Sequence, residues 1–383
     1  MSAQTAHPVW ARIDLRNLTH NVRLLQRQAG GVPLWPAIKA NAYGHDALLV
    51  ARHLLTLGID TLCVARVEEA LGLVEAGVQA RLLVLSGATA EHARECVRHA
   101  LEPVVAQVQT LEALQQAAAI AGRRIDVHLK VDTGMMRFGM APEAVGVMLE
   151  RCSRLPNLRV RSLMSHFACA DEADKRSARE QLQCFTRVRA IGMAHGVPLY
   201  HMANSAALLD LPEALFDAAR PGIAIYGLKP SDQLHNPIAE QLRPVLSLHS
   251  LVSLVKTVPA GVGISYGHAF HTSTATRVAT LPVGYGDGIA RGLSGRLEVL
   301  IGGRRCPQIG RITMDQMLVD VSALWDTVRV GDEAVLIGSQ PSAESSSAGS
   351  STTIRADELA ALGGTINYEI VTAIAARVPR VAG

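Results

Sequence analysis

The stretch TLCVARVEEALGLVEAGVQARLLVLS, residues 61–86, shows the repeating pattern from which the fold class can be predicted. A short apolar run (61–65) is followed by a segment whose apolar residues have helical spacing (67–76), and then by a second apolar run (81–86). Runs that are apolar at successive positions are typical of parallel strands covered by helices. The stretch therefore predicts a strand–helix–strand unit in a parallel sheet.

The same alternation extends from residue 34 to about residue 227. The expected strands have the bounds 34–40, 61–65, 81–86, 102–106, 126–131, 160–167, 199–203 and 222–226. Eight such units match a (β/α)8 barrel. The alternative is an open doubly wound sheet, which commonly has a glycine-rich first turn, and no GxGxxG follows the first expected strand. We predict the α/β class, with a TIM-type barrel over residues 1–243.

The pattern of apolar residues changes after Arg243. Helical periodicity nearly vanishes, and short apolar runs alternate with glycine and proline turns. This pattern predicts a β-rich C-terminal domain over residues 244–383, with which the first ten or so residues could pack. Within it, residues 339–353 (SQPSAESSSAGSSTT) are expected to form a low-complexity surface loop, and residues 354–362 a short helix.

Composition excludes several classes of protein. The 383 residues are 49% hydrophobic and 19% charged, which is globular composition. With 37 basic against 34 acidic residues, the net charge of +3 gives no reason to expect nucleic acid or a membrane as partner. The six cysteines form no CxxC pair, and HExxH and EF-hand motifs are absent, so we expect no metal site. Without a signal peptide or a long apolar run, we expect a cytoplasmic protein.

Lys39 is the first candidate for chemistry, because barrel active sites lie at the carboxyl ends of the strands. It ends the first expected strand among apolar residues. An amine in a low-dielectric site loses its proton more easily, and a neutral amine forms a Schiff base with an aldehyde. The alternative is an ordinary exposed lysine at a strand end.

Two further features indicate a functional site. Tyr43, Tyr266 and Tyr285 lie in glycine-flanked loops, where a tyrosine presents its hydroxyl more readily than it fills a core. The alternative is that each ring covers an exposed edge. Ser205 and the Gly222–Ile223 amides follow the seventh and eighth expected strands, where many barrels bind phosphate.

Nine segments, in order and at the usual spacing, resemble bacterial alanine racemases over essentially the whole chain. They are AIKANAYGHD (37–46), HLKVDTGMMRFG (128–139), SHFACA (165–170), ANSAA (203–207), RPGIAIYG (220–227), GISYG (263–267), LPVGYGDGIAR (281–291), GRITMDQ (310–316) and TINYE (365–369). The resemblance implies an isomerase that interconverts L-alanine and D-alanine with pyridoxal 5'-phosphate. It also implies a homodimer whose active site is shared between subunits. The enzyme would supply D-alanine for peptidoglycan synthesis or would serve alanine catabolism. For the substrate, the alternative is a racemase of broader specificity for small amino acids.

The resemblance also implies roles for individual residues. Lys39 corresponds to the lysine that binds the cofactor aldehyde, and Tyr266 to the second base, which reaches the site from the partner subunit. Arg220 corresponds to the arginine that faces the pyridine nitrogen, with His166 beside it. The remaining cofactor contacts correspond to Tyr43, Asn204, Ser205, Gly222, Ile223 and Tyr368.

Three more residues complete this set. Arg137 and the backbone amide of Met314 correspond to contacts with the substrate carboxylate. Lys130 corresponds to a lysine that is carbamylated in many family members and braces Arg137. Thr313 departs from the family pattern, since many members have cysteine there.

Two other classes compete with this interpretation. A barrel-type pyridoxal-phosphate decarboxylase has the same two-domain plan, but GISYG, TMDQ and TINYE do not fit it. A carrier that holds the cofactor without turnover would not need the β-rich domain that contains Tyr266.

Overall fold

The computed structural model describes residues 7–86, 88–341 and 351–383. Contacts between Cα atoms divide the chain into two compact units. The first, which we call the barrel unit, comprises residues 16–243. The second, the β unit, comprises residues 1–15 and 244–383.

Six parallel strands in sequential order form the sheet of the barrel unit. They are β2 (Thr61–Val64), β3 (Arg81–Val84), β4 (Glu102–Val105), β5 (Ile125–Lys130), β6 (Leu158–Met164) and β7 (Leu199–His201). Most of their residues are buried, as the uninterrupted apolar runs predict.

Two further extended segments close this sheet on itself. Residues 217–220 bond to the end of β7, since the Asp217 and Arg220 N–H groups donate to the carbonyls of Tyr200 and Ala203. Residues 33–38 lie between that segment and β2: Trp35 N–H donates to Ala219 O, and Ile38 N–H to Cys63 O. The predicted (β/α)8 barrel is thereby confirmed, with both segments joined by parallel bridges.

The eighth expected strand is displaced from its predicted position. Residues 222–226 were expected to be extended, but Ile223–Tyr226 form the 3-10 helix η4. Pro221 has no N–H to donate to a neighbouring strand, and Gly222 has a non-extended backbone (φ −110, ψ −96), so the strand ends there. The first strand also ends early, because the chain turns at Lys39.

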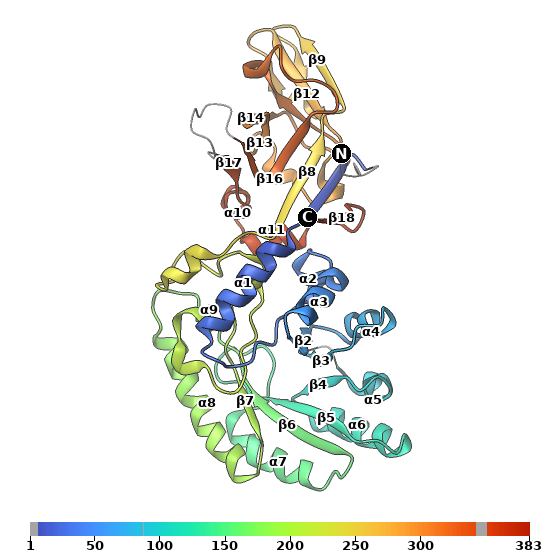
Figure 1. Ribbon diagram of the computed structural model, residues 1–383, viewed down its shortest axis with the longest axis vertical. Coiled ribbons are helices and arrows are strands. Elements are labelled where there is room, and N and C mark those ends of the chain that lie inside the picture. Colours follow the sequence, from blue (N-terminus) through green and yellow to red (C-terminus); the bar gives the residue numbers. More distant parts are fainter. Residues whose placement is uncertain (1–6, 87, 342–350) are drawn as a thin grey trace. The chain divides into compact units, whose positions relative to one another are not determined.

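Helices cover the outer side of the curved sheet (Figure 1). In chain order they are α1 (Leu15–Gln28), α3 (Ala47–Thr56), α4 (Val67–Glu75), α5 (Ala93–Arg98), α6 (Val108–Ile120), α7 (Val145–Ser153), α8 (Arg176–Ala194) and α9 (Ser205–Asp210). Their apolar stripes explain their orientation. In α1, for example, Leu18, Val22 and Leu25 are fully buried at helical spacing.

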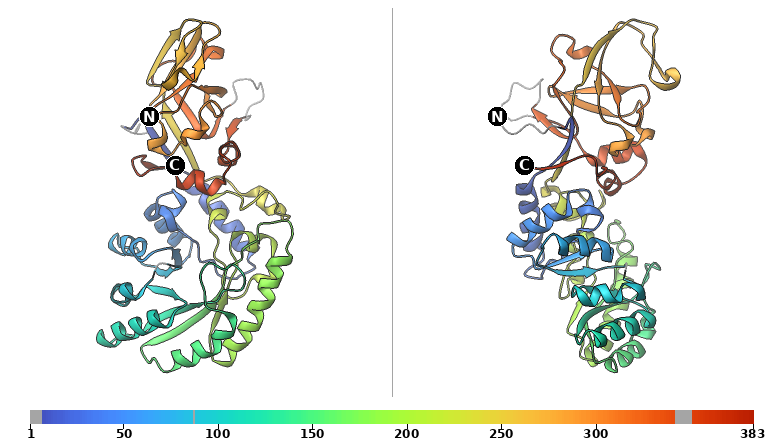
Figure 2. Two further views of the ribbon diagram at one scale, coloured as in Figure 1. Left: turned by 180° about the vertical axis from the view of Figure 1, so that it is seen from behind. Right: turned by 90° about the vertical axis from the view of Figure 1, so that its right-hand side faces the viewer.

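The β unit is built on one strongly bent, mostly antiparallel sheet (Figure 2). Its strand order is β18-β1-β8-β16-β13-β14-β15-β12-β9. The bounds are β1 (Val9–Ile13), β8 (Leu246–Leu251), β9 (Leu254–Val258), β12 (Thr276–Leu281), β13 (Glu298–Ile301), β14 (Arg304–Ile309), β15 (Met317–Asp320), β16 (Glu333–Pro341) and β18 (Arg380–Ala382). A second, two-stranded sheet pairs β10 (Gly263–Ile264) with β11 (Phe270–His271).

The N-terminal strand belongs to this sheet. β1 pairs antiparallel with β8, with Trp10 opposite His249, and parallel with β18. The expected helix over 354–362 is α10 (Ala356–Gly363), and α11 (Asn367–Thr372) follows it. The ends of the serine-rich segment pair as β16 and β17 (Ser351–Ile354), while residues 342–350 lie outside the described residues.

Candidate active site

Lys39 stands at the start of an unusual turn. It begins α2 (Lys39–Tyr43), in which Ala40, Asn41, Ala42 and Tyr43 all have φ between 51° and 55°. Left-handed backbone costs a non-glycine residue roughly 1–2 kcal/mol. Strain of this kind persists only where surrounding contacts fix it, and it concentrates at functional sites.

The contacts that hold this turn come from Glu69 on α4. One carboxylate oxygen accepts the Ala40 N–H at 2.7 Å, and the other accepts the Ala65 N–H at the end of β2, also at 2.7 Å. The Asn41 side chain accepts the Ala47 N–H at 2.8 Å. Glu69 therefore ties the turn after Lys39 to the neighbouring strand, a role that the sequence analysis missed.

The electrostatic environment of Lys39 favours the neutral amine. Burial lowers the pKa of Lys39, and the nearby Arg137 guanidinium lowers it further, although the Glu69 carboxylate opposes them. A neutral amine at a barrel mouth is able to attack an aldehyde.

Four of the predicted cofactor contacts meet beside this turn. Ser205 Oγ accepts the Gly222 N–H at 2.8 Å and the Ala224 N–H at 3.3 Å. A Cβ built on Gly222 would lie 2.4 Å from the Tyr43 hydroxyl oxygen, so only glycine fits there. Ile223 follows, fully buried at the start of η4.

This arrangement fits a phosphate group. The Ser205 oxygen accepts two N–H groups, and no acceptor for its own hydroxyl proton is found in the described part of the chain. That proton can be donated to a ligand oxygen. Asn204, the residue before Ser205, has a different role. Its side-chain oxygen caps α9 by accepting the Ala207 N–H at 2.9 Å.

Arg220 lies inside the barrel and is buried. Its guanidinium donates to the Ser165 carbonyl at 2.7 Å and to Nδ1 of His201. Burial lowers the pKa of Arg220 to about 10, which still leaves it protonated at neutral pH. His201 thus stands beside Arg220, and the sequence analysis assigned no role to His201. Arg220 is also close enough to His166 to lower the pKa of that histidine.

A chain of hydrogen bonds continues from His201 through the barrel interior. His201 Nε2 lies 2.8 Å from Ser162 Oγ, which lies 2.7 Å from His128 Nδ1. His128 Nε2 lies 2.9 Å from a carboxylate oxygen of Glu102, and Arg81 binds that carboxylate at 2.6 and 2.7 Å. Glu102, His128, Ser162 and His201 are all buried.

With neutral histidines, the chain has one consistent set of donors. A guanidinium cannot accept a hydrogen bond, so His201 Nδ1 accepts and its Nε2–H donates to Ser162. Ser162 then donates to His128, whose Nε2–H donates to Glu102. Burial raises the pKa of Glu102, but hydrogen bonds from His128 and Arg81 outweigh this and lower it to about 2. Burial lowers the pKa of both histidines, which favours their neutral forms, and Glu102 is ionised at neutral pH.

The other predicted barrel residues form a basic cluster in which the arginines hold the positive charge. Lys130 ends β5, and its pKa is well below the usual value because it is buried and close to Arg220 and Arg137. The pKa of His166 is lowered well below its usual value by burial and then by Lys130 and Arg220. Arg137 itself is exposed, in the loop after β5. Such a cluster favours an anionic ligand.

The remaining predicted residues, Tyr266, Met314 and Tyr368, belong to the β unit. Tyr266 is 71% exposed and lines a hollow of about 530 Å³ together with His268, Arg311 and Thr313. The Met314 N–H has no acceptor among the described residues. Tyr368 lies in the first turn of α11.

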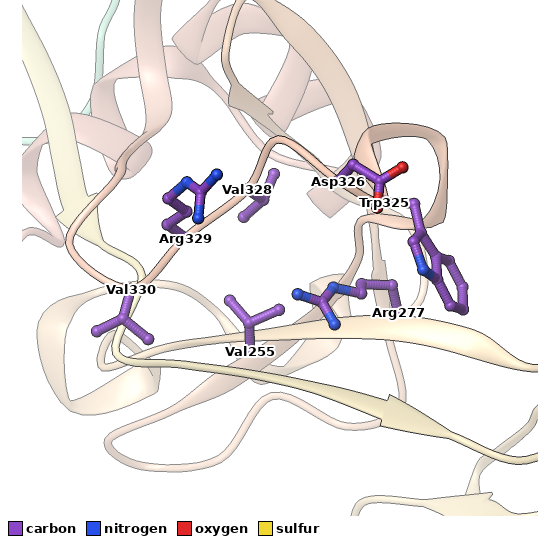
Figure 3. A pocket seen from close by; sticks show the side chains of 7 residues that line it. All are labelled: Val255, Arg277, Trp325, Asp326, Val328, Arg329 and Val330. Carbon is purple, nitrogen blue, oxygen red and sulfur yellow. The ribbon is translucent and has the colours of Figure 1, made fainter.

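A separate hollow in the β unit contains none of the predicted residues. Its volume is about 340 Å³, and it is lined by residues of β9, β12 and the segment 325–330 (Figure 3). It lies at the opposite ends of β12 and β15 from Tyr285 and Met314.

Two negative findings concern the described residues alone. Over residues 7–86, 88–341 and 351–383, no three His, Cys, Asp or Glu side chains are grouped so as to hold a metal ion. No helix in the same ranges has the length and hydrophobicity needed to cross a membrane.

Comparisons with known proteins agree with the geometry. Residues 13–230 match the family model of the alanine racemase N-terminal domain, and residues 245–382 match that of the C-terminal domain. Curated relatives named alanine racemase include one from Desulfovibrio desulfuricans, 41% identical and covering 98% of each chain. Another, from Symbiobacterium thermophilum, is 42% identical over 100% of this chain and 99% of its own.

Solved structures give the same result. The crystal structure of alanine racemase from D-cycloserine-producing Streptomyces lavendulae has a TM-score of 0.90 and 40% identity, covering 99% of this chain and 98% of that one. Alanine racemase of Clostridium difficile 630 has a TM-score of 0.92 and 33% identity, covering 99% and 97%.

Proposed function

The chain belongs to the alanine racemase family, and we propose that it interconverts L-alanine and D-alanine by two-base proton transfer with pyridoxal 5'-phosphate as cofactor. We call the cluster of Tyr43, Ser205, Gly222 and Ile223 the phosphate cradle. The single observation that carries this proposal is that Lys39, whose pKa is lowered, occurs together with this cradle, in which a Cβ on Gly222 would collide with Tyr43. An amine for the aldehyde and donors for the phosphate are the two contacts that this cofactor needs.

The residues that would hold the cofactor come from the barrel unit. When bound, pyridoxal phosphate supplies an aldehyde that condenses with an amine and a conjugated ring that accepts negative charge from the α-carbon. Lys39 would bind the aldehyde. Tyr43, Ser205, Gly222 and Ile223 would bind the phosphate, with Tyr368, Asn204 and His166 as further contacts.

Arg220 would face the pyridine nitrogen. A guanidinium donates hydrogen bonds without giving up its proton, so the ring nitrogen it faces stays unprotonated. A buried carboxylic acid in that place would protonate the ring. The hydrogen-bond chain from His201 to Glu102 holds the guanidinium in one orientation, because Nδ1 of His201 accepts a hydrogen bond from it.

The two bases are Lys39 and Tyr266. Racemisation removes a proton from one face of the α-carbon and returns one to the other, so it needs a base on each face. Lys39 would serve one face and the Tyr266 hydroxyl the other. We propose that Tyr266 comes from the second subunit of a homodimer, so that each active site is complete only in the dimer.

The substrate carboxylate would bind Arg137 and the Met314 N–H. Burial and the nearby Arg220 and Arg137 lower the pKa of Lys130 well below its usual value, which favours the neutral amine. Such an amine suits reaction with carbon dioxide, in which the nitrogen forms a bond to carbon and releases one proton. The resulting carbamate anion would pair with Arg137. A cytoplasmic location and a role in peptidoglycan synthesis or alanine catabolism complete the proposal.

The direct test is circular dichroism of D-alanine incubated with the purified protein and pyridoxal phosphate. Loss of the signal to zero at constant amine concentration supports a racemase. Release of carbon dioxide would identify a decarboxylase, and no change would identify a carrier. Turnover of D-serine at a rate similar to that of D-alanine would identify the alternative, a racemase of broader specificity.

A further inference from the structure

Arg377 connects two loops of the β unit. The first, the Gly284 loop (residues 284–288), contains Tyr285 and Asp287; the second, the Met314 loop, comprises residues 313–316. The Arg377 guanidinium donates to both carboxylate oxygens of Asp287, at 2.7 and 3.0 Å. It also donates to Met314 O at 3.3 Å and pairs with Asp315 at 2.8 Å.

The two loops are also bonded directly to each other. Tyr285 N–H donates to Thr313 O at 3.0 Å, and Gly286 N–H donates to Met314 O at 2.8 Å. The approach is too close for side chains: a Cβ on Gly284 would lie 2.1 Å from Thr313 O. A Cβ on Gly286 would lie 2.6 Å from an Arg377 nitrogen.

These bonds fix the peptide groups on both sides of Met314. The Met314 N–H shares a planar peptide with Thr313 O, which is held by Tyr285. The Met314 carbonyl is held by Gly286 and Arg377. The Met314 N–H is therefore fixed in direction, and it has no acceptor within the described ranges of the chain.

We infer that Arg377 is a positioning residue, which holds the Met314 amide in place for the substrate carboxylate and holds Tyr285 beside it. This inference rests on the proposed function, in which the Met314 N–H is a carboxylate contact. Arg377 also balances charge, because Asp287 and Asp315 would otherwise repel an incoming carboxylate from the same loops.

Arg377→Gln removes both the positive charge and the two parallel hydrogen bonds to the Asp287 carboxylate. Arg377→Lys keeps the charge but cannot make both hydrogen bonds in the same geometry. Arg159→Gln is a matched control, since the Arg159 guanidinium donates to both carboxylate oxygens of Asp126 at 2.5 Å, and Arg159 belongs to β6 of the barrel unit and not to the β unit. Each variant is prepared as the cofactor-loaded enzyme. The measurements are kcat and KM for D-alanine, inhibition by acetate, thermal unfolding and the visible absorbance of the bound cofactor.

We expect Arg377→Gln to raise both the KM for D-alanine and the inhibition constant of acetate by about tenfold or more, the effect of losing a charge-assisted bond. Its kcat and cofactor absorbance should change little. Arg377→Lys should lie between Arg377→Gln and the wild type, and Arg159→Gln should match the wild type in KM.

Unchanged KM and acetate inhibition in Arg377→Gln would overturn the inference. So would a loss of activity that follows only the fraction of unfolded protein. If the wild type itself fails to racemise alanine, the proposed function is wrong. In that case calorimetry can still compare acetate binding to the wild type and to Arg377→Gln. Weaker binding to Arg377→Gln would show that Arg377 positions the Met314 amide for a carboxylate.

Discussion

Nδ1 of His201 accepts a hydrogen bond from the guanidinium of Arg220 in the interior of the barrel. Because arginine cannot accept, this one contact determines the tautomer of His201 and, through Ser162, that of His128. The orientation of Arg220 thus depends on residues that come from four different strands.

Ser162→Ala tests this dependence. Without the hydroxyl, the Nε2–H of His201 and Nδ1 of His128 lose their shared partner in a buried site. An unsatisfied buried polar group costs about 1–3 kcal/mol, so the free energy of unfolding in urea should fall by that amount or more. Ser250→Ala is the control, since Ser250 is equally buried but its hydroxyl makes only one weak hydrogen bond, at 3.3 Å, to the described residues. Equal stability losses in the two variants would contradict the proposed importance of the chain.

The same histidines predict how stability depends on pH. Burial lowers the pKa of both His128 and His201, so the folded protein holds them neutral. Below about pH 6.5 the unfolded chain binds protons that the folded chain does not, and stability falls as pH falls. We expect a loss of up to about 1.4 kcal/mol per pH unit for each histidine, measured by urea unfolding at pH 7.5 and 5.5. An unchanged midpoint would show that the histidines are charged or exposed. Glu102 does not change the stability in this range, because its pKa is about 2 in the folded protein and about 4.3 in the unfolded chain, both below pH 5.5.

Gly222→Ala tests the phosphate cradle. The new Cβ would lie 2.4 Å from the Tyr43 hydroxyl oxygen, so Tyr43 has to move and the cradle is disrupted. We expect the Kd for pyridoxal phosphate to rise by about tenfold or more, as for loss of one or two charge-assisted bonds. The measurement is titration of the apo-protein by absorbance. Gly72→Ala on α4 is the control, because a Cβ there meets nothing within 4 Å. Equal affinities in the wild type and Gly222→Ala would place the phosphate elsewhere.

Tyr266→Phe tests the second base. Loss of one general base should slow α-proton exchange from one enantiomer by about a hundredfold or more, while exchange from the other enantiomer, served by Lys39, is less affected. Proton exchange of L-alanine and D-alanine in D₂O, followed by NMR, measures both rates. Tyr200→Phe is the control, since the Tyr200 hydroxyl donates to the Val197 carbonyl at 2.8 Å and has no role in the proposed site. An equal loss in both directions would indicate a single base.

Much of the fold could be predicted from sequence because it depends on local periodicity. Uninterrupted apolar strands alternate with amphipathic helices, and this alternation produces the barrel. The eighth strand was misplaced because the GIAIY run is as apolar as a strand, yet it follows Pro221 and Gly222, at which the chain turns. The role of β1 could only be suggested, since its partner β8 lies more than 230 residues away in the chain.

The candidate site was predicted in part. Residues such as Lys39 and Tyr43 lie in short contiguous motifs, which sequence reasoning can find. Glu69 and the chain from His201 to Glu102 were missed because their contacts exist only once the barrel has closed. A signal was nevertheless present: Glu102, His128, Ser162 and His201 are polar residues within otherwise apolar strands. Such residues must find partners inside a barrel.

The account depends most directly on the bond between Lys39 and the cofactor aldehyde. The decisive measurement is borohydride reduction of the protein loaded with pyridoxal phosphate, followed by mass spectrometry of its peptides. We predict that the cofactor mass is attached to Lys39 alone and that Lys39→Ala retains none of it. A label on another lysine, or no label on a protein that still racemises alanine, would contradict the account.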